Sequence, residues 1–295
     1  MLLRLLRRHL APYQASLVVI GVLQLTQAMA TLFLPALNAD IIDLGVATGD
    51  TAYIMRTGGV MLAITLVQVA CAIAAVYVGA RVALALGRDV RASIFGHVQT
   101  FSAREVGHFG APSLITRTTN DVQQVQMVVL LTFTIMVAAP IMMIGGVVMA
   151  MRQDIVLSAL LLVIVPLLVV LIALIIRQMR PLFRSMQVRI DSINRVLREQ
   201  ITGIRVIRAF VREDFERERF ADANAELTDV SVRVGRLMAL MFPPVLVVLN
   251  ASSVAVIWFG GHRIAEGTMQ VGELTAFLTY LLQILMAVMM ATLML

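Results

Sequence analysis

The segment with the densest charge in the sequence is EQITGIRVIRAFVREDFERERF, residues 199–220, which holds five arginines and five acidic residues. Charges at this density can form ion pairs with one another or with a docking partner. Other reactive groups are sparse. The single cysteine, Cys71, lies in an apolar run, and the four histidines show no spacing typical of metal ligands: His9, His97, His108 and His262. We therefore expect no metal site and no catalytic residue.

Lysine is absent, because all 24 residues counted as lysine or arginine are arginine. A phosphate-binding loop of the Walker A type needs a lysine that contacts the β- and γ-phosphates of ATP. The sequence also lacks the glycine cluster of such a loop. This chain is therefore not expected to hydrolyse ATP alone.

The composition, 60% hydrophobic and 14% charged, is that of an integral membrane protein, since soluble domains carry about 25% charged residues. A spanning helix needs about 20 apolar residues. Six windows satisfy this requirement, so we expect an all-α membrane protein with spans at about 15–37, 58–80, 128–150, 155–176, 237–260 and 274–295.

All but three of the arginines fall in three stretches, 4–8, 81–117 and 177–236. These stretches lie on one side of the membrane if the spans alternate, and the positive-inside rule makes that side cytoplasmic. We expect a multi-pass protein of the bacterial cytoplasmic membrane with both ends in the cytoplasm. Topology explains the excess of positive charge, and nucleic acid is not expected as a partner.

Residues 1–12 are expected to form an interfacial (elbow) helix, with leucines in the headgroup layer and arginines at the phosphates. The alternative is a secretory signal peptide, because Ala28, Met29 and Ala30 resemble a cleavage site. Cleavage there would remove one span and break the alternation that collects the arginines on one side.

Two long connections, about 81–125 and 177–236, keep helical periodicity and are expected to form cytoplasmic hairpins. A helix over the 34 residues from 177 to 210 would be about 50 Å long. The net charge changes from +4 over 195–212 to −5 over 213–229, which predicts a turn between them. Gly203 suggests that another backbone comes close. An apolar stripe should pack on a partner helix: Ile201, Ile204, Ile207, Val211 and Phe215.

The first hairpin is predicted to turn within residues 107–121. Gly107, Gly110 and Pro112 break the helical pattern and leave room for one short helix. Asn120 and Asp121 are expected to cap the long helix that follows.

These residues resemble the transmembrane domain of ABC transporters of the exporter (type IV) fold. Residues 110–125, with Thr118 to Asp121, resemble the first intracellular loop of that family. The second loop and the last span carry further matching residues: Glu199, Gly203, Ile207, Phe210 and Glu213 in the loop, and Gly272, Leu274, Ala276, Phe277 and Tyr280 in the span. More narrowly, the chain resembles one half of an actinobacterial heterodimeric multidrug-type transporter.

The resemblance implies that the two hairpin tips are coupling helices that dock on nucleotide-binding domains, the second on the partner subunit's. It implies as partners the lipid bilayer and a second half-transporter, preferably a different chain, with ATP and Mg²⁺ in the missing nucleotide-binding domain. The coupling residues would be Pro112, Ser113, Leu114, Arg117, Thr118, Asn120, Asp121, Glu199, Gly203, Phe210, Val211, Glu213 and Phe215.

The domain expected here is therefore a six-helix transmembrane domain over residues 13–295. Its sequence stops within an apolar run at Leu295, where no helix-ending signal occurs. We expect the natural chain to continue into an ATPase domain. The alternative is a permease encoded apart from its ATPase.

The spans carry almost no charge in their centres, since Asp40, Asp43 and Glu273 fall near span ends. This argues against a proton- or sodium-coupled carrier. Methionines and uncharged polar groups suit a deformable cavity for amphipathic compounds such as drugs or lipids, although such groups also serve ordinary helix packing. Because the resemblance implies that the fifth and sixth spans face the path, the substrate candidates are Asn250, Thr279, Gln283, Met286 and Met290.

Two other functions remain open from the sequence. An importer of siderophore type would share the fold, because transport direction is not encoded in the spans. A membrane sensor with cytoplasmic signalling helices would need continuous heptads after the last span and no second basic hairpin, and the second hairpin is present.

Overall fold

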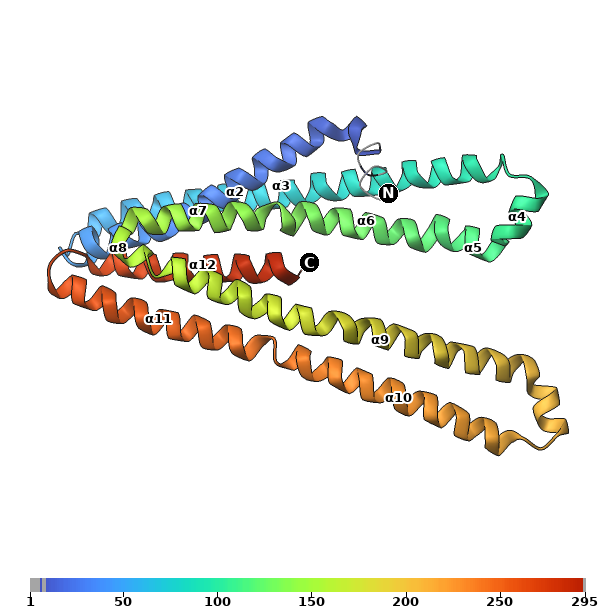
Figure 1. Cartoon of the computed structure of the whole chain (residues 1–295). Coiled ribbons are helices and arrows are strands. Elements are labelled where there is room, and N and C mark those ends of the chain that lie inside the picture. The colour runs from blue at the N-terminus through green and yellow to red at the C-terminus, as the bar shows by residue number, and fades with distance from the viewer. Residues whose placement is uncertain (1–5, 7–8, 294–295) are drawn as a thin grey trace. The chain divides into compact units, whose positions relative to one another are not determined.

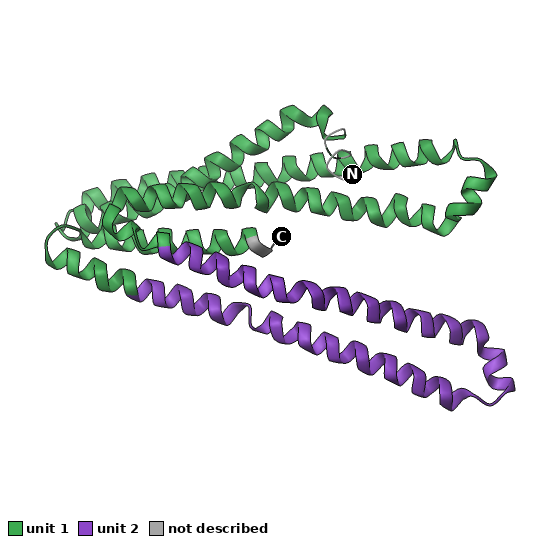
Figure 2. Cartoon of the chain, in the orientation of Figure 1, with its two compact units in different colours: residues 1–162, 255–295 green, residues 163–254 purple. Residues whose placement is uncertain are grey.

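The computed structural model describes residues 6 and 9–293, and every regular element in that part of the chain is helical. Six helical segments are long and apolar enough to cross a membrane. The expected all-α architecture with six spans is thus confirmed. The chain divides into two compact units, residues 1–162 with 255–295 and residues 163–254 (Figure 2).

The first unit is built on four packed helices, α2 (Gln14–Asp40), α3 (Thr51–Val98), α7 (Ala138–Gln153) and α12 (Val271–Leu293). Helix α6 (Val122–Leu131) packs on α3 and completes the first hairpin (Figure 1). Shorter elements connect these helices: Ala11–Tyr13, the π-helical Ile41–Val46 (η2), α4 (Ala103–Phe109), α5 (Ala111–Thr116), the π-helical Arg117–Asp121 (η3) and Thr132–Met136 (η4), and α8 (Ile155–Ser158).

Helix α12 holds the centre of the first unit. Phe277, Tyr280 and Ile284 are fully buried, and the Tyr280 hydroxyl donates to the backbone oxygen of Leu32 in α2 at 2.8 Å. On α7, a side chain at Gly146 would lie 2.7 Å from Ile284. A glycine in α7 therefore lets this helix approach α12, as small residues do between membrane helices.

The start of α12 is fastened to the end of α2. The Gly272 backbone N–H donates to Asp43 Oδ1 at 2.7 Å. A Cβ atom at position 272 would lie 2.4 Å from the backbone oxygen of Ala39, so only glycine fits without moving the backbone. The last-span motif is thus explained by packing, since Gly272, Phe277 and Tyr280 all hold α12 against its neighbours.

The second unit contains α10 (Glu213–Ala239) and most of α9 (Leu161–Ala209) and α11 (Phe242–Ala265); its boundaries fall inside the latter two helices. Helices α9 and α10 run side by side as the second hairpin (Figure 1). The predicted continuous helix ends at Ala209, and the chain reverses before Glu213. The turn predicted from the change of charge is confirmed.

Most of the predicted interfacial helix at residues 1–12 lies outside the described residues. Leu6 and Leu10 pack against a buried cluster that includes Leu86, Val90 and Val122. The Tyr13 hydroxyl donates to Asp89 Oδ2 at 2.6 Å. Leu6, Leu10 and Tyr13 are therefore attached to the base of the first hairpin.

Candidate docking tips and an apolar cavity

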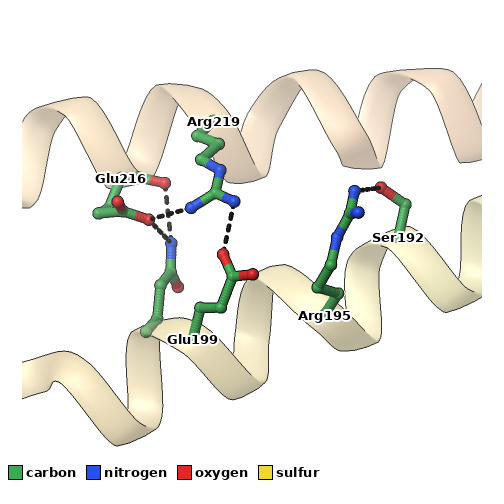
Figure 3. A network of polar contacts seen from close by, with 6 residues as sticks. Ser192, Arg195, Glu199, Glu216 and Arg219 are labelled. Carbon is green, nitrogen blue, oxygen red and sulfur yellow. Dashed lines mark hydrogen bonds and ion pairs between the residues drawn. The ribbon is translucent and has the colours of Figure 1, made fainter.

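The second hairpin is held together by polar contacts behind its tip (Figure 3). Arg219 of α10 pairs with Glu199 of α9 at 2.5 Å, and the Gln200 amide donates to the backbone oxygen of Glu216 at 2.9 Å. Further along the hairpin Arg189 pairs with Glu226. We call the contacts among Glu199, Gln200, Glu216 and Arg219 the clasp. Because its opposite charges face each other across the two helices, the clasp favours one register of α9 against α10.

The predicted apolar stripe is wrong over part of its length. Ile204 and Ile207 line a hollow of about 270 Å³ with Phe220 of α10. Ile201 is 74% exposed. Val211 and Phe215 cannot continue a helical stripe, because the helix ends at Ala209 and the chain reverses between them.

The tip of the second hairpin exposes its apolar side chains. Phe210 is 73% exposed, Val211 82% and Phe215 57%. Val211 has φ = +52°, in the left-handed region, which is a strained conformation for a β-branched residue. Exposed apolar groups on a rigid arm are typical of a surface that another protein covers.

Two predicted residues of this hairpin have different surroundings from those expected. Glu199 lies behind the tip, where it pairs with Arg219 in the clasp. A Cβ atom at Gly203 would have no atom within 4 Å among the described residues, so no backbone of this chain approaches it there. Glu213 begins α10 and lines the same hollow as Ile204.

The first hairpin turns through α4, which begins with a complete capping box. The Ser102 hydroxyl accepts from the Glu105 backbone N–H at 3.3 Å, and Glu105 Oε2 accepts from the Ser102 backbone N–H at 2.7 Å. The hydrogen bond from the Ser102 backbone N–H, together with one from the Ser102 hydroxyl to the same carboxylate oxygen, holds the pKa of the Glu105 carboxyl below its usual value. The helix ends at Gly110, with φ = +74°.

Aromatic contacts close this first tip. The Phe101 and Phe109 rings stack at 5.6 Å, and the Arg117 guanidinium lies 5.5 Å from the Phe109 ring centre. His97 contacts Phe101 and His108 contacts Phe109, both edge to face. The tip is thus braced by its own side chains.

The predicted caps of the first hairpin are wrong. Asn120 and Asp121 lie inside the π-helical stretch Arg117–Asp121, and neither makes a side-chain capping bond. The short crossing helix is Ala103–Phe109, earlier than expected, because Ser102 and Glu105 provide the stronger helix start. The remaining candidates lie at the start of the returning helix: Pro112, Ser113, Leu114, Arg117 and Thr118.

A cavity of about 400 Å³ lies between η4, α7 and α12. Three of the predicted substrate residues line it, Gln283, Met286 and Met290. The Gln283 side-chain oxygen is buried and has no hydrogen-bond partner among the described residues. The rest of the lining is largely apolar: Thr134, Ile135, Ala138, Ala139, Met142, Leu282 and Ala287.

The wall of this cavity includes a π-helical stretch, Thr132–Met136. Such stretches leave backbone carbonyls without their usual helical partner and occur frequently at functional sites. Here the Gln24 side-chain amide donates to the backbone oxygen of Phe133. A neighbouring helix therefore satisfies a freed carbonyl, as irregular backbone within a membrane requires.

The other two substrate candidates do not line this cavity. The Thr279 hydroxyl donates to the backbone oxygen of Thr275 at 3.0 Å, one turn earlier in α12. Asn250, in the second unit, donates to the backbone oxygen of Leu246 at 2.9 Å. Both side chains satisfy their own helix, which is the ordinary packing role for such groups.

One buried ion pair was not anticipated from the sequence. Asp154, between α7 and α8, pairs with Arg263 near the end of α11 at 2.7 Å, and its side chain is 6% exposed. The other oxygen of Asp154 accepts from the Leu157 backbone N–H at 2.7 Å and caps α8. The two residues are 109 positions apart, so only the fold brings them together.

A family model described as the ABC transporter transmembrane region matches residues 17–288. The chain belongs to this family. Its members have the exporter-type six-span fold seen here. An uncharacterized ABC transporter ATP-binding protein of Mycobacterium tuberculosis (strain CDC 1551 / Oshkosh) is 54% identical over 292 residues, 99% of this chain and 50% of the relative.

More distant relatives of this ABC transporter domain have functional names. An ATP-dependent lipid A-core flippase of Syntrophus aciditrophicus is 26% identical, over 96% of this chain and 46% of the relative. A putative multidrug export ATP-binding/permease protein of Bacillus subtilis is 25% identical, over 65% of this chain and 33% of the relative. The chain spans about half the length of the relatives most similar to it.

Proposed function

We propose that this chain is the membrane domain of an ATP-driven exporter that moves hydrophobic or amphipathic compounds, drugs or lipids, by alternating access. Its relatives named as a lipid A-core flippase and as a putative multidrug export protein support this substrate class. The expected location is the bacterial cytoplasmic membrane, with both ends in the cytoplasm, as the arginine distribution favours.

The observation that carries the proposal is the cavity beside α12. The flexible methionines Met142, Met286 and Met290 and a largely apolar wall suit ligands of varied shape. The unpartnered oxygen of Gln283 offers one acceptor to a hydroxyl or amide N–H of a ligand. Within residues 9–293 no charged side chain lines this cavity, which disfavours strongly ionic substrates.

The hairpin tips would transmit the movements of the nucleotide-binding domains to the spans. In this proposal α4 and residues 210–215 dock on nucleotide-binding domains that bind ATP and Mg²⁺, the second on the domain of a partner half-transporter. The exposed Phe210 and Phe215 supply the apolar contact, and the clasp behind them keeps α9 and α10 moving as one body. We favour a different chain as the partner.

The substrate assignment is tested by a substitution that fills the cavity. The test uses the full natural protein with its partner, reconstituted in proteoliposomes. Met286→Trp should abolish ATPase stimulation by amphipathic cations and by short-chain lipids, while basal ATPase activity stays within about twofold of wild type. Met151→Trp is the matched control, because Met151 and Met286 are both 48% exposed and Met151 does not line the cavity.

Unchanged stimulation in Met286→Trp would remove the cavity from the substrate path. Direction is measured in the same vesicles. Compounds that accumulate on the side opposite the nucleotide-binding domains support an exporter, whereas uptake toward those domains would favour the importer alternative.

A further inference from the structure

A second cavity, of about 440 Å³, lies beside the Asp154–Arg263 ion pair and outside the substrate path proposed above. One wall is aliphatic and comes from α8 and the turn after it. The other comes from the last turns of α11 and carries one aromatic and three polar residues. The lining residues are Val156, Leu157, Ala159, Leu160, Phe259, His262, Arg263 and Glu266.

This second cavity lies where α11 leaves the hydrocarbon layer. The apolar run of α11 continues to Phe259 and is followed by His262 and Arg263. Trp258 is 65% exposed and Phe259 52%. Aromatic rings at the end of a span lie at the level of the lipid headgroups, so the cavity has an aliphatic wall facing acyl chains and polar groups at headgroup depth.

The polar groups of this cavity retain unused bonding capacity. The Arg263 Nε donates to Asp154, while its two terminal nitrogens have no protein acceptor among the described residues. The Glu266 carboxylate has no ion-pair partner within residues 6 and 9–293. His262 Nδ1 lies 2.9 Å from the Trp258 backbone oxygen; as the donor to it, the neutral ring keeps Nε2 as an acceptor.

We propose that this cavity binds one phospholipid with a zwitterionic, amine-bearing headgroup of the phosphoethanolamine type. The phosphate accepts from the free guanidinium nitrogens of Arg263. The ammonium donates to Glu266 and to Nε2 of His262, and an acyl chain covers Leu160 and Phe259. An anionic headgroup would meet the Glu266 carboxylate without a compensating cation, and a choline headgroup has no N–H to donate.

Native mass spectrometry of the purified full-length protein with its partner, loaded with equal amounts of phosphatidylethanolamine, phosphatidylcholine and phosphatidylglycerol, tests this assignment. Wild type should retain one phosphatidylethanolamine per chain with about tenfold preference over the other two lipids, the ratio that one charge-assisted contact supplies. Ala159→Phe fills the cavity and should remove this lipid. Ala70→Phe, at an exposed alanine of α3 away from the cavity, should retain it.

Glu266→Gln leaves the Asp154–Arg263 pair intact and separates the headgroup preference from the fold. It should reduce the preference for phosphatidylethanolamine over phosphatidylglycerol about tenfold while one lipid is still retained. Equal retention by wild type and Ala159→Phe, or a wild-type preference for phosphatidylglycerol, would overturn the proposal. A wild-type complex that holds no lipid, with the partner subunit cross-linking to a cysteine placed at position 159, would assign the cavity to the subunit interface instead.

Discussion

At the tip of the first hairpin the aromatic side chains contact one another, whereas at the tip of the second they face solvent. Phe109 stacks on Phe101 beneath Arg117 and is 39% exposed. Phe210 and Phe215 have no such partners among the described residues and are 73% and 57% exposed. The first tip is therefore shaped by its own contacts, while the second leaves its apolar surface exposed.

The two tips also differ in how the chain reverses. The first uses favourable local chemistry, a capping box at Ser102 and a glycine with positive φ at Gly110. The second places Val211 in the left-handed region, where a β-branched residue is strained. The two helices behind this tip are joined by the apolar side chains of Ile204, Ile207 and Phe220 and, to a smaller extent, by the clasp. A tip that is stabilised from behind leaves its whole end surface available for docking.

The largest effect is expected when the second tip loses its exposed surface. Phe210→Ala combined with Glu213→Ala should lower ATP-driven transport at least about tenfold while the protein stays folded, because the lost contacts lie with the partner. Ile201→Ala is the matched control, since Ile201 is 74% exposed on the same hairpin but behind the tip. Transport and substrate-stimulated ATPase at wild-type levels in the double variant would contradict the docking role.

Phe109→Ala should affect the stability of the first tip, whereas the changes at the second tip affect contacts with the partner. Loss of the stacking and of the contact with Arg117 should destabilise α4 by about 1–2 kcal/mol. Hydrogen exchange of the α4 amides measures this change, with α10 as the internal reference. If α4 kept its protection and only docking failed, the two tips would work alike and the contrast drawn above would not hold.

Val211→Gly should stabilise the second tip by about 1 kcal/mol, because relief of the left-handed strain outweighs the added freedom of glycine in the unfolded chain. The measurement is the exchange rate of the amides of residues 210–216. Gly110→Val at the first tip is the reciprocal change and should destabilise that tip. A destabilised Val211→Gly variant would show that the valine side chain, rather than the turn geometry, holds the reversal.

The smallest effect is expected from the clasp. Glu199→Gln removes one ion pair whose partners are 38% and 48% exposed, and such pairs contribute little in water. Exchange of the first turns of α10 should rise less than about threefold. A larger rise that disappears in 1 M salt would mean that electrostatic pairing, and not the hydrophobic contacts of Ile204 and Ile207, stabilises the hairpin.

Signals that are local in sequence predicted the architecture correctly. Long apolar windows marked the six spans, and the change of charge after Arg212 marked the reversal of the second hairpin. Each of these features depends on residues within one helix or on either side of one turn.

Features that depend on register or on distant residues were missed or misplaced. The capping-box pattern of Ser102 and Glu105 marks the start of the first crossing helix, whereas the breakers at Gly107 to Pro112 predict a later one. The clasp of Glu199 with Arg219 depends on how the turn aligns two helices. The pair of Asp154 with Arg263 needs the folded arrangement of α8 and α11, which no local pattern encodes.

The contact between Gly272 and Asp43 has a mechanical consequence for the cavity. It makes the start of α12 a pivot, because the backbone there is bonded to η2 and leaves no room for a side chain. At 1.5 Å per residue, Gln283 lies about 16 Å from this pivot and Met290 about 27 Å. A tilt of α12 about the pivot and away from α7 displaces Met290 further than Gln283, so the methionine end of the cavity widens more than the end that carries the hydrogen-bond acceptor.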